Sequence, residues 1–128
     1  MNNFVNMLKK YDDFVSLEGA SENDIKSAEI ELRVIFSEDY KQYLSKYGAA
    51  SSNGHEFTGI SASKRLNVVD VTKRIRDRGY NIPKDFYVVE ELDIDDIVVC
   101  QNQKGEVYQF DKNSSKRIFK SLAEYLAI

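Results

Sequence analysis

The stretch DFYVVEELDIDDIVVCQNQKGEVYQFDKNSSKRIFK, residues 85–120, decides the fold class. Apolar runs of strand length alternate here with short segments that carry Asp, Asn, Gly or Ser, the pattern of strands joined by tight turns. We predict strands within residues 85–92, 96–102, 106–111 and 116–120, with Lys104-Gly105 as the tightest turn. Successive strands with short connections favour antiparallel pairing.

Upstream of this stretch the apolar residues recur with the period of a helix. Ser21, Ser37 and Asn67 each precede such a segment as an N-cap, and Gly48 and Gly79 end two of them. The predicted inward positions are Phe4, Met7, Leu8, Tyr11, Ile25, Ala28, Leu32, Ile35, Tyr40, Tyr43, Leu44, Tyr47, Val68, Val71, Thr72 and Ile75.

The segments between these helices are assigned as follows. Residues 12–20 are a connector or a short edge strand, residues 50–55 a polar loop, residues 57–60 a short strand and residues 121–128 a closing helix. Helices first and strands later predict an α+β fold, with a mainly antiparallel sheet of about four to six strands and helices packed on one face.

Length and composition bound the class of protein. The 128 residues fit one domain, 1–128, and 42% hydrophobic and 30% charged residues are typical of a soluble globular chain. The net charge of -3 argues against a dedicated nucleic-acid binder. One cysteine excludes an internal disulfide, and the N-terminus has no signal-peptide pattern, so we expect a cytoplasmic protein without a membrane span.

The order and spacing of these segments resemble a known family. Residues 28–60, AEIELRVIFSEDYKQYLSKYGAASSNGHEFTGI, look like the opening motif of the SUKH superfamily, which includes the Smi1/Knr4-like domains. Ser37 stands where the family usually has proline, and serine can cap the helix that proline would start. The matching positions are Ile25, Glu29, Leu32, Tyr40, Leu44, Tyr47, Gly48, Gly59, Pro83, Gly105, Tyr108, Phe110 and Asp111.

The resemblance implies a binding domain without catalytic residues or a cofactor. Most bacterial members are similar to immunity proteins, which bind and neutralise a cognate polymorphic toxin, often a nuclease. Fungal members are similar to regulatory interaction proteins. We therefore expect either an immunity protein or a regulatory scaffold without a toxin partner.

An acidic run marks a candidate contact for a basic toxin. Residues 88–99, VVEELDIDDIVV, hold five carboxylates and nothing basic, namely Glu90, Glu91, Asp93, Asp95 and Asp96. The flanking strands predict a hairpin turn with exposed carboxylates and with Leu92 or Ile94 tucked inward. A turn needs one or two acidic residues, so we assign the excess to a basic partner.

Other candidate chemistry is weaker. His55, the single histidine, is expected in a solvated loop, although Ser51, Ser52 and Glu56 are close in sequence. Cys100 is expected to be a buried thiol. The acidic run lacks the spacing of a calcium loop and any feature that would position a glycosidase substrate.

The segment 64–78 carries six basic residues, Lys64, Arg65, Lys73, Arg74, Arg76 and Arg78. A nucleic-acid hypothesis would place phosphates on this face. We favour a solvated helix with internal ion pairs, including Asp70 with Arg74, because no aromatic ladder is present for base stacking. Most Tyr and Phe residues are expected in the core. Tyr80 and Tyr87 are the candidates for exposure at an interface, although the core is the favoured role for each.

Overall fold

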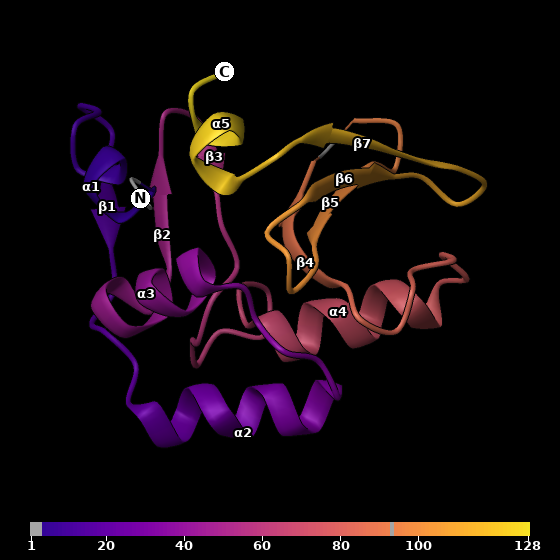
Figure 1. Cartoon of the computed structure of the whole chain (residues 1–128), viewed down its shortest axis with the longest axis horizontal. Helices are drawn as coiled ribbons and strands as arrows, with labels where there is room; N and C mark the ends of the chain where they lie inside the picture. The colour runs from indigo at the N-terminus through magenta and orange to yellow at the C-terminus, as the bar shows by residue number, and fades with distance from the viewer. Residues whose placement is uncertain (1–3, 93) are drawn as a thin grey trace.

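A computed structural model describes residues 4–92 and 94–128 and confirms the α+β class. The helices are α1 (Phe4–Leu8), α2 (Glu22–Leu32), α3 (Glu38–Tyr47), α4 (Val68–Asp77) and α5 (Leu122–Leu126). The strands are β1 (Val15–Ser16), β2 (Ala50–Ser52), β3 (His55–Glu56), β4 (Tyr87–Glu91), β5 (Val98–Gln101), β6 (Val107–Phe110) and β7 (Ser115–Phe119). Figure 1 shows the strands between α5 and the layer formed by α2 and α4.

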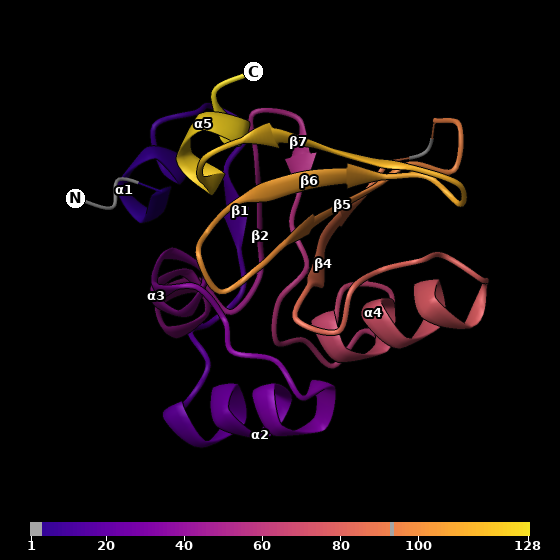
Figure 2. The same ribbon diagram turned by 45° about the vertical axis from the view of Figure 1, so that its right-hand side comes forward.

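The strands form two antiparallel sheets, one of order β1-β2-β3 and one of order β4-β5-β6-β7. The sheets meet at Thr58, whose N–H donates to the carbonyl of Val89 at 2.9 Å and whose hydroxyl donates to the carbonyl of Val88 at 2.7 Å. The side of β4 that faces away from β5 is therefore partly closed. The outer strands are β1 and β7, as the turned view in Figure 2 shows.

The predicted caps are confirmed. The side chains of Ser21, Ser37 and Asn67 accept hydrogen bonds from backbone N–H groups in the first turns of α2, α3 and α4. Gly48 follows α3 with a φ of 70°, in the region that favours glycine. These local signals fix where each helix begins and ends.

The predicted polar loop at 50–55 is wrong. Residues 50–56 form the β2–β3 hairpin, in which Ser52 pairs with His55 across the turn Asn53-Gly54. Both turn residues have positive φ, 50° and 77°, as a tight two-residue hairpin requires. His55 is therefore in a strand. The strand predicted at 57–60 is reduced to a bridge between Gly59 and Asn67.

Both faces of the four-stranded sheet are covered, where one covered face was predicted. Val88 and Cys100 point into a cluster beneath α4, whereas Val89 and Val99 point into the larger cluster with residues of α1, α2, α3 and α5. A strand buried on both faces carries a near-continuous run of apolar side chains. This explains why the strand sequences read as continuous apolar runs.

Residues that carry the family resemblance build this scaffold. A Glu29 carboxylate oxygen accepts the N–H of Phe36 at 2.8 Å and ties α2 to the start of α3. A Cβ on Gly59 would lie 1.9 Å from the carbonyl oxygen of Gly48, so only glycine permits this approach of the two backbones. The motif is thus a set of packing and backbone requirements.

Candidate protein-interaction site

The acidic run divides among three environments. Glu90 is buried, with 4% exposure, so the expectation that its carboxylate is exposed is wrong. Glu91 is half-buried and forms an ion pair with Arg74 of α4. Asp93 lies outside the described residues. Asp95 and Asp96 are exposed, as predicted.

A β-bulge explains why adjacent glutamates face opposite ways. In the β4–β5 pairing, Val88 lies opposite Cys100 but Glu90 lies opposite Val99, so one extra residue is present in β4. Such a residue breaks the alternation of side chains along a strand. Val89 and Glu90 consequently face the same side, and Glu91 faces α4.

The Glu90 carboxylate has three donors around it. His55 Nδ1 donates to Glu90 Oε1 at 2.9 Å, and the Tyr125 hydroxyl donates to the same oxygen. The N–H of Glu56 donates to Glu90 Oε2 at 2.7 Å. The carboxylate therefore joins β3, β4 and α5 from within the protein, which is a structural role.

His55 is correspondingly not a solvated loop residue. Its ring lies 4.6 Å from that of Tyr125 and 5.6 Å from that of Phe57, and its side chain is 11% exposed. Burial lowers the pKa of His55, but the hydrogen bond and negative charge of Glu90 outweigh it, so the pKa is raised. The carbonyl of Ile128 and the charge of Asp13 add to the increase.

The polar residues near His55 in sequence are engaged elsewhere. The hydroxyl of Ser52 donates to the carbonyl of Leu8 at 2.6 Å. Glu56 holds Arg65 through two hydrogen bonds, of 2.6 and 3.1 Å. The arrangement around His55 therefore ties the fold together rather than pairing a nucleophile with a base.

The exposed part of the acidic run is a constrained turn, which we call the acidic turn (residues 94–96). Asp95 and Asp96 have φ values of 54° and 56°, a left-handed conformation that costs a non-glycine residue of the order of 1 kcal/mol. The Tyr80 hydroxyl donates to the carbonyl of Asp96 and fixes the turn from α4's side. Ile94 beside them is 65% exposed.

The acidic turn borders a hollow of about 300 Å³. Its walls include Asp95, Asp96 and Glu91, with Arg78 at the end of α4. Leu92 packs against the larger core cluster, which bears out the expectation that Leu92 or Ile94 turns inward. A surface with an exposed isoleucine, two exposed carboxylates and a polar hollow can receive a basic side chain from a partner.

Three of the six cations in the basic segment 64–78 form ion pairs within the protein. Lys73 donates to Glu31 at 2.7 Å, Arg74 pairs with Glu91, and Arg65 pairs with Glu56. Arg76 donates to the backbone carbonyls of residues 83, 84 and 86. The predicted ion pairs within the helix are wrong: the three observed pairs lead to residues outside the segment, and Arg74 takes Glu91 rather than Asp70 as its partner.

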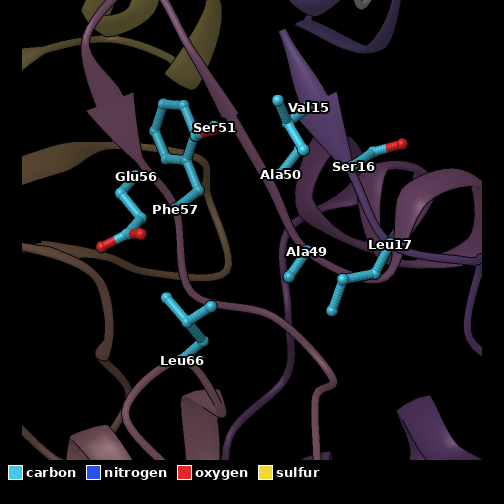
Figure 3. Close-up of a pocket in the computed structure, with 9 residues that line it drawn as sticks. All are labelled: Val15, Ser16, Leu17, Ala49, Ala50, Ser51, Glu56, Phe57 and Leu66. Atoms are coloured by element: carbon cyan, nitrogen blue, oxygen red, sulfur yellow. The ribbon is translucent and has the colours of Figure 1, made fainter. Parts of the chain in front are cut away.

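A small apolar hollow lies between β1 and the β2–β3 hairpin (Figure 3). Its volume is about 140 Å³, close to the roughly 150 Å³ of a cavity that takes one benzene molecule. Val15 and Leu17 stand at its rim, 65% and 48% exposed, and Phe57 lies inside. The hollow has the size for one apolar side chain and is small for a metabolite.

Several smaller expectations are also settled. Cys100 is fully buried and burial raises the pKa of its thiol, as expected of a packed, unreactive cysteine. Tyr80 and Tyr87 are buried, 6% and 0% exposed, which bears out the core as their favoured role and excludes them as exposed anchors. Across residues 4–92 and 94–128, no helix combines the length and apolar character that a membrane crossing requires.

Comparison with known proteins identifies the family. The family model SUKH_5, described as SMI1-KNR4 cell-wall, matches residues 1–127. The chain belongs to this family. A crystal structure of a protein from Pseudomonas syringae pv. tomato is similar, with a TM-score of 0.73 and 14% identity over 95% of this chain and 92% of the other. That likeness supports the fold alone, and no curated protein sequence matches significantly.

Proposed function

We propose that this SUKH-family protein is an immunity protein that binds and neutralises a cognate toxin by direct contact. The acidic turn is the observation that carries the proposal. Its two aspartates are exposed at the tip of a turn that is closed by the hydrogen bond from the Ile97 N–H to the Ile94 carbonyl and held by the Tyr80 hydroxyl.

The chemistry of the turn favours a basic partner. A nuclease must hold phosphates and so carries positive charge where its substrate binds. Asp95, Asp96 and Glu91 would meet such a surface with complementary charge, which accelerates encounter and selects the partner. Exposed Ile94 would add an apolar contact at the centre of the same patch.

A rescue assay tests the proposal. A toxin domain encoded by an adjacent gene is expressed with and without this protein, and the purified pair is tested for a stable complex. Rescue of growth together with a complex supports immunity. Failure of both would remove the immunity function and leave the regulatory scaffold, which the cell-wall description of the matching family favours, as the remaining function.

The role of the turn is tested separately by association kinetics. The triple variant D93N/D95N/D96N should associate with the toxin about tenfold more slowly at low salt, because it lacks the charges that steer encounter. The matched control E18Q/E22Q/D24N removes three carboxylates of a distant surface, at and before the start of α2. Equal association rates for the two variants would exclude the turn from the interface without excluding immunity.

A further inference from the structure

Strand β7 is an open edge of the four-stranded sheet. It pairs with β6 on one side only, and in both views no helix or strand covers its outer side (Figures 1 and 2). Residues 115–117 are exposed. An uncovered edge of this kind presents unpaired N–H and C=O groups to which another extended chain can bond.

The register shows which backbone groups face outward. The N–H of Asp111 donates to the carbonyl of Ser114, so this pair is hydrogen-bonded across the hairpin. Hydrogen-bonded and non-hydrogen-bonded pairs alternate along an antiparallel ladder. Lys116, opposite Gln109, therefore bonds inward, whereas the N–H and C=O groups of Ser115 and Arg117 point away from β6.

The same edge is strongly basic. Lys112, Lys116, Arg117 and Lys120 are all exposed. Arg117 pairs with Glu106 at 3.3 Å. Within the part of the chain that the structure describes, the three lysines have no ion pair, unlike Lys73, Arg74 and Arg65 of the basic segment. The edge thus keeps cationic side chains available.

A hollow runs beside β7, between it and α5. It has a volume of about 570 Å³ and its walls include Ile118, Phe119, Lys120 and Glu124. Ile118 and Phe119 are half-buried and pack against the larger core cluster. A strand laid along β7 would therefore find apolar surface for alternate side chains next to the basic ones.

We propose that the β7 edge binds an extended acidic segment of a partner protein by strand addition. A second copy of this chain is disfavoured because pairing two β7 strands would oppose lysines to lysines. A nucleic acid could meet the lysines, but its phosphate backbone has no donors for the outward carbonyls of Ser115 and Arg117. An acidic strand satisfies both the charges and the backbone groups. The proposal does not depend on the toxin.

The test uses the full-length protein, isotope-labelled for NMR, and a capped decapeptide of alternating glutamate and valine. Amides of residues 115–119 should shift, and hydrogen exchange should slow at Ser115 and Arg117. Comparison probes are a lysine-valine repeat, a glutamate-proline repeat in which every second residue lacks a backbone N–H, and oligothymidylate. The lysine-valine and glutamate-proline repeats should both bind more weakly than the glutamate-valine peptide.

Two variants with matched controls locate the binding. S115P removes one outward N–H while keeping every cation, and should weaken binding about fivefold relative to S115A, the factor that one net hydrogen bond contributes. K116E/K120E should weaken it about tenfold at low salt, whereas K9E/K10E should not. Circular dichroism and thermal unfolding check that each variant is folded. If S115P does not fold, the K116E/K120E variant still tests the proposal.

Several outcomes would overturn the proposal. Shifts that avoid residues 115–119 would place the peptide elsewhere. Equal binding of the glutamate-proline repeat would show that charge alone accounts for the interaction, without the backbone hydrogen bonds of an added strand. Tighter binding of oligothymidylate to the same amides would indicate a nucleic-acid surface, and shifts that follow protein concentration alone would indicate a second copy.

Discussion

Replacing Glu90 with glutamine tests whether the buried part of the acidic run contributes to the stability of the fold. In E90Q the side chain keeps its shape but only one oxygen, so one of the donors from His55, Glu56 and Tyr125 faces an amide N–H₂. A buried donor left without an acceptor costs about 1–3 kcal/mol, and the other two hydrogen bonds lose their charge assistance. We expect a loss of about 3 kcal/mol in the free energy of unfolding.

The assay is urea unfolding followed by fluorescence and circular dichroism, with E91Q as the matched control. Glu91 is the next residue, but its ion pair with Arg74 is partly open to solvent, with side-chain exposures of 29% and 34%. A pair of this kind contributes about 1 kcal/mol or less. Equal losses in the two variants, or a loss below about 1 kcal/mol in E90Q, would refute the interior role of Glu90.

Three further predictions follow from the same interior. Glu90 raises the pKa of His55 in the folded protein. The stability that the protonated imidazole contributes is therefore complete below the unfolded pKa, about 6.5, and is lost as the pH rises through the folded pKa. The difference in unfolding free energy between wild type and E90Q should consequently shrink from pH 6 to pH 8.5. Gly59→Ala should cost at least about 3 kcal/mol by urea unfolding, since its Cβ would lie 1.9 Å from the Gly48 carbonyl oxygen, and a loss below about 1 kcal/mol would contradict this. Cys100 should resist a thiol reagent in the native protein and react in urea, because burial raises the pKa of its thiol; rapid native labelling would show the cluster to be open.

Local signals of the sequence were sufficient for much of the fold. Ser21, Ser37 and Asn67 cap their helices because each cap needs only one side chain and the next few N–H groups. Asn53-Gly54 is an equally local signal, the preferred sequence of a two-residue hairpin, yet we predicted a loop there because the flanking segment is polar and short. The continuous apolar runs also indicate a sheet that is covered on both faces.

The candidate site could be predicted only in part, because its residues are sorted by a single backbone irregularity. Without the β4 bulge, Glu90 would point toward α4 and Glu91 into the cluster around His55 and Tyr125. A bulge shifts every following side chain to the opposite face, and no pattern of five carboxylates in a row encodes it. The number of carboxylates in the run is therefore larger than the number that the surface displays, because Glu90 is buried and Glu91 is paired with Arg74.

What remains of that surface is smaller but better defined. Among the carboxylates of the run that the structure describes, Asp95 and Asp96 are exposed, and the Tyr80 hydrogen bond to the Asp96 carbonyl holds the backbone that carries them. A fixed pair of charges loses little conformational entropy when a partner binds, whereas five mobile ones would have to be ordered. The bulge directs the Glu90 carboxylate to the donors of β3 and α5, and these hydrogen bonds hold the strand from which the acidic turn projects.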